Sequence, residues 1–205
     1  IATGSQPRNP TDVPIDHEHV LDSDSILSMA YLPKSLTVIG SGVIASEYAC
    51  TFNALGVEVT MIDRSPRMLA FLDEELSDEV RLAFEREGGR YLGGRTAKIE
   101  IDGGMVSAKL DDGTEVRSEK LLYCLGRVAC FKGLNLEAAG VAPDARGLLA
   151  VDEHLRTSVP HIYAVGDVIG PPSLAATAME QGRRAACHAL GIPEPGRPTT
   201  EAYAG

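Results

Sequence analysis

The hydrophobic pattern in the first half of the chain switches between short apolar runs and helical spacing. Residues 35–40, SLTVIG, form a short apolar run of the kind expected for a buried parallel strand. Residues 43–55 then carry apolar side chains at helical spacing. A second strand is predicted over 57–63, VEVTMID, and an amphipathic helix over 72–88. This alternation predicts an α/β fold with a parallel, Rossmann-like sheet.

From residue 97 onward the pattern changes to short runs separated by glycine turns. The runs are AKIEID at 97–102, MVSAKL at 105–110, TEVRS at 114–118 and KLLYCLG at 120–126. Turns of the Asp-Gly-Gly and Asp-Asp-Gly type separate the first three. We interpret all four runs as an antiparallel β-meander inserted into the α/β unit.

The flanking regions are less regular. Residues 1–22 are predicted to be extended, because three prolines block a helix, and a short helix should follow and stop before Pro33. In the second half we expect a short helix at 133–141 and an irregular strand pair at 148–158. The run HIYAVGD at 161–167 predicts a clear strand.

The last predicted element is a helix within residues 171–191. Ser173 is its expected N-cap, and Gly191 should end it.

The net charge and the cysteine spacing exclude several classes of partner and site. The formal net charge of −10 argues against a nucleic-acid or anionic-membrane partner, because phosphate binding needs clustered Lys and Arg. No apolar run approaches the roughly 20 residues that span a bilayer. The four cysteines show neither a zinc pattern nor a disulfide framework, so we expect no metal and reduced thiols in a cytoplasmic protein. A redox pair of Cys124 and Cys130 is the less favoured alternative.

The strongest motif is the run Gly40-Ser41-Gly42-Val43-Ile44-Ala45 between the first predicted strand and its helix. The first glycine permits a tight turn, the second lets a pyrophosphate approach the backbone, and the small Ala45 lets the helix pack on the strand. The N–H groups and positive end of that helix would face the anion. With an acid at the end of the next strand, this context predicts a dinucleotide site rather than a structural glycine turn.

That acid, Asp63, is predicted to bind the adenosine ribose of the dinucleotide. A carboxylate there can accept hydrogen bonds from both adenosine-ribose hydroxyls of NAD, and it would repel the 2′-phosphate of NADP. Arg64 and Arg67 follow at once, and either could reach such a phosphate, although both could equally be solvated loop charges. The site therefore favours NAD without forbidding NADP.

A second candidate is Asp167, which follows Gly166 at the end of the apolar run YAVGD. A carboxylate beside a helix N-terminus suits a polyol-bearing ligand. Many strands end in Gly-Asp as a plain turn, so this motif by itself leaves both readings open.

Taken in order, several motifs resemble the flavoprotein pyridine nucleotide-disulfide oxidoreductases. These are ATGS at 2–5, GSGVIASE at 40–47, the acid at 63, CLGR at 124–127 and YAVGD at 163–167. Other segments look most like the soluble pyridine nucleotide transhydrogenase branch, which lacks the redox disulfide and passes hydride between NAD(H) and NADP(H) through FAD. These segments are DSDSILSM at 22–29, LAFLDEELSD at 69–78, YAVGDVIGPPSLA at 163–175 and MEQGR at 179–183.

The resemblance implies a division into domains. Residues 1–23 would end the first half of a split FAD-binding domain, and 24–127 would form the NAD(P)-binding domain. Residues 128–190 would be a remnant of the returning FAD half, and 191–205 a linker towards a dimerisation domain. Both chain ends look interrupted, so we expect a piece of a longer protein that forms a homodimer or higher homo-oligomer.

The resemblance also implies roles for single residues. Glu47 would lie near the nicotinamide and the flavin, with a surface helix glutamate as the alternative reading. Val43 stands where a gating tyrosine is found in glutathione reductase, so no aromatic lid is expected. Asp167 would bind the flavin ribityl chain, and the backbone at Leu174 and Ala175 would face the flavin ring. The expected cofactor-binding residues are Gly40, Gly42, Val43, Ala45, Asp63, Arg64, Arg67, Gly126, Gly166, Asp167, Leu174 and Ala175.

The implied activity is hydride transfer from NADPH to NAD⁺ through FAD, with the nicotinamide dinucleotides as substrates. One alternative is dihydrolipoyl dehydrogenase or another disulfide or metal reductase of the same family. Another is a stand-alone, non-catalytic NAD-binding module. From these 205 residues alone we expect neither retained FAD nor turnover.

Overall fold

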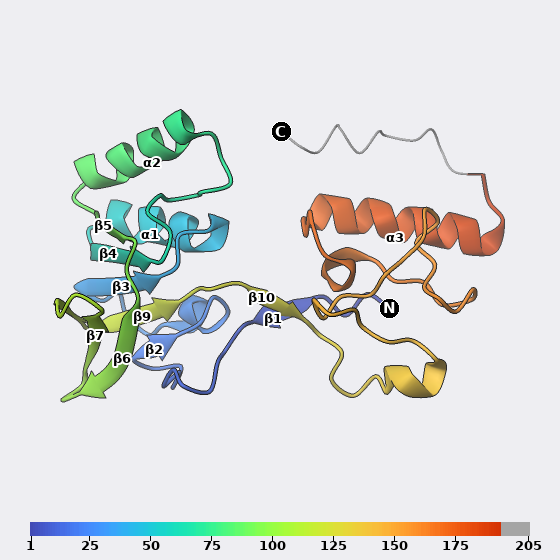
Figure 1. Ribbon diagram of the computed structural model, residues 1–205, viewed down its shortest axis with the longest axis horizontal. Coiled ribbons are helices and arrows are strands. Elements are labelled where there is room, and N and C mark those ends of the chain that lie inside the picture. The colour runs from blue at the N-terminus through green and yellow to red at the C-terminus, as the bar shows by residue number, and fades with distance from the viewer. Residues whose placement is uncertain (194–205) are drawn as a thin grey trace. The chain divides into compact units, whose positions relative to one another are not determined.

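Two compact units make up the computed structural model, which describes residues 1–193 (Figure 1). One unit comprises Pro7–Gly126. The other comprises Ile1–Gln6 and the chain from Arg127 onward. Most of the predicted linker at 191–205 therefore lies outside the described residues. The first unit begins well before residue 24, the expected boundary, because its earliest strand is hydrogen-bonded into the main sheet. The assignment of cofactor domains to these segments stays a prediction.

A five-stranded sheet with parallel pairing throughout forms the centre of the Pro7–Gly126 unit. Its strands, in spatial order, are β2 (Val20–Leu21), β9 (Lys120–Tyr123), β3 (Ser35–Ile39), β4 (Glu58–Asp63) and β5 (Arg90–Gly93). The helices α1 (Val43–Ala54) and α2 (Glu74–Arg86) follow β3 and β4 as predicted. The α/β, Rossmann-like fold class is confirmed.

The two faces of the sheet bury different residues because side chains alternate along each strand. Leu36 and Val38 of β3 belong to one core cluster with Ala45 and Ala49 of α1. Ile39, at the end of the same strand, belongs to a second cluster with residues of the antiparallel strands. Figure 1 shows α1 and α2 on one side of the sheet and the antiparallel strands on the other.

The β-meander has three strands rather than four. It consists of β6 (Ala97–Asp102), β7 (Met105–Leu110) and β8 (Glu115–Ser118), paired antiparallel. The fourth predicted run is instead β9, between β2 and β3 in the parallel sheet. The burial pattern explains the difference. Strand β8 alternates exposed and buried positions, whereas Lys120, Leu121 and Leu122 of β9 are all buried, as a central parallel strand requires.

Short elements complete this unit. The helix predicted before Pro33 is a 3-10 turn, η1 (Ser25–Ser28). Strands β2 and β5 were not predicted, because runs of two and four residues carry little periodic signal.

The second unit has a smaller core, in which Val141, Leu149, Ala164 and Val168 are buried together. Its two-stranded sheet joins β1 (Ser5–Pro7) to β10 (Arg127–Ala129). Helical elements are η2 (Leu136–Ala139), η3 (Gly166–Ile169) and α3 (Ala175–Leu190).

The strand predicted at 161–167 is wrong as a regular element. Tyr163 forms an isolated bridge with Arg156, and residues from Gly166 turn into η3. The Ile1 amino group donates to Tyr163 O, and Val165 N–H donates to Ile1 O. These two hydrogen bonds involve a single partner residue, so they do not form a continuous β-ladder.

The start of α3 also differs from the prediction. Leu174, with φ −111° and ψ 141°, is the N-cap, and no side chain caps the helix. Ser173 has φ +48°, which is left-handed rather than the extended conformation that an N-cap residue adopts. At the other end, Gly191 in the left-handed conformation terminates the helix as predicted.

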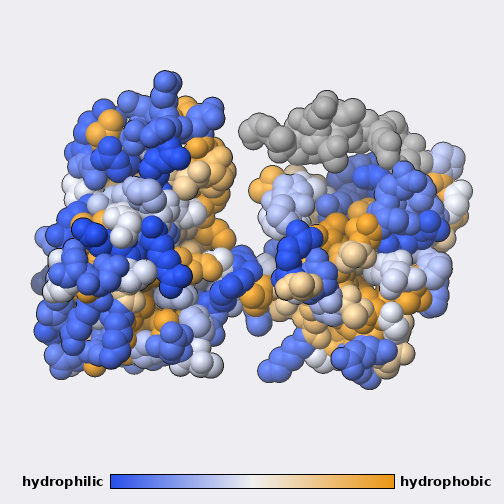
Figure 2. All heavy atoms as spheres, in the orientation of Figure 1, coloured by the Kyte–Doolittle hydropathy of each residue, from blue (hydrophilic) through white to orange (hydrophobic). Residues whose placement is uncertain are grey.

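The surface and the thiols give further detail. Figure 2 shows hydrophobic side chains at the surface of both units among mostly hydrophilic ones, and the most exposed large ones are Leu27, Phe71, Met179 and Leu190. None of the four cysteines forms a disulfide with another. None of the helices in residues 1–193 combines the length and apolar character needed to cross a membrane.

Candidate nucleotide-binding site

The glycine-rich turn joins β3 to α1 at the carboxyl edge of the sheet. Gly40 has φ +119°, and a Cβ added there would lie 2.5 Å from the carbonyl oxygen of Cys124. The Gly40 N–H donates to Ile62 O, and the Cys124 N–H donates to Ile39 O, both at 2.9 Å. The turn is therefore drawn against the neighbouring strands so closely that only glycine fits.

Gly42 has a different reason to be glycine. It is the N-cap of α1, with φ −73°, and a Cβ added there would meet nothing within 4 Å. No side chain caps this helix end, so the N–H groups of the first turn are available to an anion. The open space beside Gly42 fits a pyrophosphate that approaches the backbone. Ala45, 1% exposed, packs into the core below.

The loop after β4 is tied to this turn. Leu69 N–H donates to Ser41 O at 2.9 Å, and the hydroxyl of Ser46 donates to the same carbonyl oxygen at 3.3 Å. Ser41 is itself buried. The glycine turn and the segment that follows Asp63 therefore form one connected edge.

Asp63 ends β4, and the pairing of Ile39 with Ile62 places it next to the turn. Its Oδ1 accepts a hydrogen bond of 2.6 Å from Ser65 N–H, which orients the carboxylate. No donor within residues 1–193 contacts Oδ2. That oxygen can therefore accept hydrogen bonds from ribose hydroxyls, the role that the sequence predicts for Asp63.

A cavity of about 120 Å³ opens at this edge. Asp63, Arg64, Arg95 and Tyr123 are among the residues that line it. Burial raises the pKa of the Tyr123 phenol, Asp12 raises it further, and the nearby Arg64 opposes the shift. The structure thus brings two carboxylates, Asp12 and Asp63, and two guanidinium groups to one small cavity.

The two arginines predicted beside Asp63 have different surroundings in the structure. Arg64 lines the cavity, whereas Arg67 forms an ion pair of 3.3 Å with Glu74 of α2. Arg95 was missed by the sequence reasoning. Only the pairing of Asp63 with Gly93, between β4 and β5, shows that the residues after β5 lie beside Asp63. The Arg95 N–H donates to Asp63 O at 2.9 Å.

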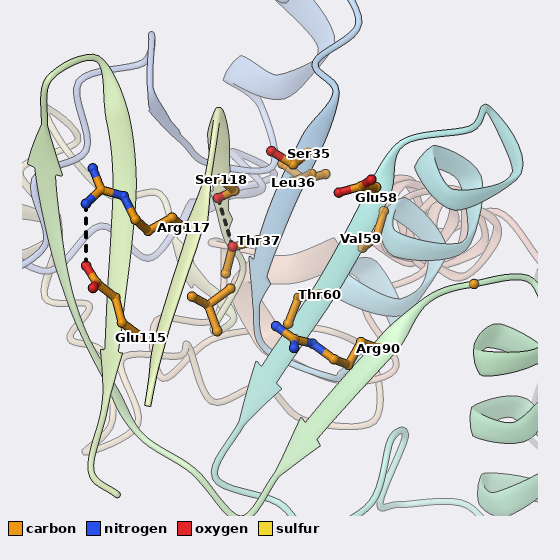
Figure 3. Close-up of a pocket in the computed structure, with 12 residues that line it drawn as sticks. Ser35, Leu36, Thr37, Glu58, Val59, Thr60, Arg90, Glu115, Arg117 and Ser118 are labelled. Carbon is orange, nitrogen blue, oxygen red and sulfur yellow. Dashed lines mark hydrogen bonds and ion pairs between the residues drawn. The ribbon is translucent and has the colours of Figure 1, made fainter. Parts of the chain in front are cut away.

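A larger cavity, of about 470 Å³, lies at the opposite end of the sheet (Figure 3). One wall comes from β3, β4 and β5 and the other from β8, and Thr37 is hydrogen-bonded to Ser118 at 2.8 Å. None of the residues predicted to bind a cofactor lines it. In open α/β sheets ligands bind at the carboxyl ends of the strands, so the smaller cavity and the glycine turn form the candidate nucleotide site.

Three further predicted residues lie near this edge. Val43, the first residue of α1, is 49% exposed. Glu47 is exposed on the same helix, one turn further on. Gly126 has φ +97°, and its carbonyl oxygen accepts the Arg8 N–H at 3.0 Å.

The second candidate group, around Asp167, lies in the other unit. Asp167 is in η3, and its Oδ2 accepts a hydrogen bond of 2.6 Å from the Ser5 hydroxyl. Gly166, with φ +75°, donates its N–H to Gln181 Oε1 of α3 at 2.7 Å. Asp167 is therefore held through its side chain, and the residue before it is held through its backbone.

The N-terminus of α3 is the other part of this group. Leu174 is 49% exposed, and Ala175 begins the helix without a capping side chain. Within the first turn, the buried Oγ1 of Thr177 has no hydrogen-bond partner among the described residues. A free helix end and an unsatisfied hydroxyl fit a polar ligand group at this position.

Comparison with known proteins gives the family. The sequence pattern of the pyridine nucleotide-disulphide oxidoreductases matches residues 1–182. The chain belongs to this family. This membership confirms the resemblance found in the sequence motifs.

Among similar proteins of this family, the soluble pyridine nucleotide transhydrogenase of Chromohalobacter salexigens is 46% identical over 186 residues. That match covers 90% of this chain and 40% of the relative. The protein of the same name from Mycobacterium tuberculosis is 42% identical over 197 residues, covering 96% and 42%. The chain thus spans about two fifths of the length of these relatives.

Solved structures of the family agree. LpdA from Mycobacterium tuberculosis superposes with a TM-score of 0.88 at 33% identity, covering 96% of this chain and 43% of that one. The HOCl-induced flavoprotein disulfide reductase RclA from Escherichia coli gives a TM-score of 0.87 at 26% identity, covering 95% and 45%.

Proposed function

We propose that this chain is the NAD(P)-binding portion of an FAD-dependent soluble pyridine nucleotide transhydrogenase that transfers hydride between NADPH and NAD⁺. The observation that carries the proposal is 46% identity across nine tenths of the chain with a protein of that name. The geometry of the glycine turn supports it, because Gly40 and Gly42 leave an uncapped helix end facing open space. A cytoplasmic homodimer or higher homo-oligomer is part of the same proposal.

This chain would bind and orient the reactants. The first-turn N–H groups of α1 would hold the pyrophosphate, and Asp63 the adenosine ribose. Asp167 and the N-terminus of α3 would hold the flavin, with Glu47 near the nicotinamide. When bound, FAD would carry the hydride from one dinucleotide to the other, so no protein side chain needs to form a covalent bond.

The cavity at Asp63 explains how one site can serve both nucleotides. The carboxylate of Asp63 favours the free ribose hydroxyls of NAD, while Arg64 offers a guanidinium group to the 2′-phosphate of NADP. Arg95 lines the same cavity but forms an ion pair of 3.1 Å with Asp112, so it would add to phosphate binding only by sharing its charge. Since a transhydrogenase must release one nucleotide and admit the other, strong selectivity would slow turnover. Acids and arginines that line one cavity would form such a compromise.

The deciding experiment uses the full-length protein. We expect a flavin absorbance band and NADPH-dependent reduction of thio-NAD without a disulfide or metal substrate. Reduction of a disulfide substrate instead, with a Cys-x-x-x-x-Cys motif in the remaining sequence, would favour a disulfide reductase of the family. NAD(H) binding without any flavin would favour a non-catalytic binding module.

A further inference from the structure

Three side chains from distant parts of the sequence form a chain of hydrogen bonds in the unit that contains α3. Arg127 Nε donates to Ser5 Oγ at 2.8 Å, and Ser5 Oγ donates to Asp167 Oδ2 at 2.6 Å. A second guanidinium nitrogen of Arg127 donates to the Ser5 carbonyl oxygen at 2.8 Å. Ser5 therefore lies between a cation and a carboxylate.

The direction of this chain follows from its chemistry. A guanidinium group only donates and an ionised carboxylate only accepts, so the single hydroxyl proton of Ser5 must point to Asp167. The positive charge of Arg127 polarises that hydroxyl and strengthens its bond to the carboxylate. No donor within residues 1–193 contacts the other oxygen, Oδ1, which stays available for a ligand.

The backbone holds the same group from several sides. Ser5 and Arg127 lie in the paired strands β1 and β10, and Cys130 N–H donates to Gly4 O at 2.9 Å. The Asp167 carbonyl oxygen accepts the Gly170 N–H at 3.1 Å within the η3 turn. The carboxylate is thus fixed in orientation before any ligand arrives.

We propose that Ser5 and Arg127 are positioning residues that orient the Asp167 carboxylate for the hydroxyl groups of the flavin ribityl chain. The proposal rests on the proposed flavin-binding role of Asp167. The chain passes between its two units immediately after Gln6 and again at Arg127. Ser5, just before the first of these points, and Arg127, at the second, are therefore joined by hydrogen bonds to the carboxylate proposed to bind the flavin.

The test measures the affinity for FAD in the full-length apoprotein, by quenching of flavin fluorescence on binding. Ser5→Ala should raise the dissociation constant about tenfold, the size expected for losing one hydrogen bond to a charged group. Ser5→Thr keeps the hydroxyl and should restore most of the affinity. In an Asp167→Asn background, Ser5→Ala should add little, because the partner carboxylate is gone.

Thr3→Ala is the matched control. The Thr3 hydroxyl donates to Cys130 O in the same segment and does not contact Asp167, so its loss should leave FAD affinity unchanged. Equal losses in Ser5→Ala and Thr3→Ala would overturn the proposal, as would a full effect of Ser5→Ala in the Asp167→Asn background. A wild-type protein that binds no FAD would instead overturn the proposed function itself.

Discussion

Single residues at the nucleotide site show that the same amino acid can be required for opposite reasons. A side chain at Gly40 would collide with the Cys124 carbonyl group, whereas a side chain at Gly42 would enter open space, which is where we propose that the pyrophosphate binds. The first requirement concerns folding, and the second follows from the proposed ligand. The sequence motif alone does not distinguish them.

Gly40→Ala and Gly42→Ala should therefore differ. At φ +119° with a contact of 2.5 Å, Gly40→Ala should lose at least about 2 kcal/mol of unfolding free energy. Gly42→Ala should keep its stability but bind NADH more weakly, because the added methyl group enters the space left for the pyrophosphate. Urea unfolding and NADH titration of the two variants separate the effects. A Gly40→Ala variant as stable as the wild type would contradict the geometry.

The variant Asp63→Ala, made in the full-length protein, tests the proposed binding of the adenosine ribose by Asp63. The variant should bind NAD(H) about tenfold more weakly through loss of a charge-assisted hydrogen bond. NADP(H) should lose far less, because removing the carboxylate also removes its repulsion of the 2′-phosphate. Dissociation constants for both nucleotides are the measurement. Glu58→Ala, at the exposed amino end of the same strand, is the control and should change neither. Equal losses for both nucleotides would count against the role of Asp63.

At the scale of elements, the short turn η1 depends on one buried carboxylate. Asp22 is 4% exposed and its Oδ1 accepts hydrogen bonds from the N–H groups of Asp24 and Ser25. Asn9 donates to its other oxygen at 2.7 Å. Burial alone would raise the pKa of Asp22, but these hydrogen bonds, led by that from Ser25 N–H, lower it to about 2.

The pH dependence of stability follows from that direction. Because the pKa of Asp22 is lower in the folded chain than its ordinary value of 3.8, its stabilisation is present above about pH 4 and is lost as the pH falls towards 2. The contribution is on the order of 2 kcal/mol. Asp22→Asn should lower stability at neutral pH and flatten the loss between pH 4 and 2, measured by urea unfolding at each pH. An unchanged acid profile would show that other carboxylates dominate.

The placement of β9 illustrates what periodicity can decide about elements. The run after β8 looks like one more meander strand, because only one residue separates the two strands. Three consecutive buried residues in β9 instead suit a strand covered on both faces. A local pattern distinguishes the two environments, but it does not name the neighbouring strands.

At the scale of the whole molecule, the two units differ in how much core they bury. Two clusters of buried apolar residues support the Pro7–Gly126 unit, whereas one smaller cluster supports the described part of the other. The candidate nucleotide site lies within the Pro7–Gly126 unit. The group around Asp167 lies within the other.

Residues 1–205 produced alone should therefore bind NADH but contain no flavin and catalyse no hydride transfer. The glycine turn, Asp63 and their supporting sheet are all present, while the family resemblance implies that part of the flavin site lies in the rest of the protein. NADH fluorescence titration and the visible absorbance of the purified chain are the measurements. A yellow preparation would contradict the prediction, and the Gly42→Ala variant is the control for specific NADH binding.

The sequence by itself determined the family, the α/β class and the glycine turn, because these depend on motifs and periodicities within a few tens of residues. Asp63 was identified for the same reason, since its offset from the turn is set by one helix and one strand. Gly191 as the end of α3 was equally local.

Only the tertiary structure decided which distant residues meet. Arg95 lies beside Asp63 because β5 pairs with β4, and Ser5 reaches Asp167 across 162 positions of sequence. No periodic pattern records such contacts, since hydrogen bonding between strands and side chains depends on where the chain returns in space. For that reason the motif indicated a candidate nucleotide site, and only the folded chain showed the arginine beside it and the serine that contacts the second carboxylate.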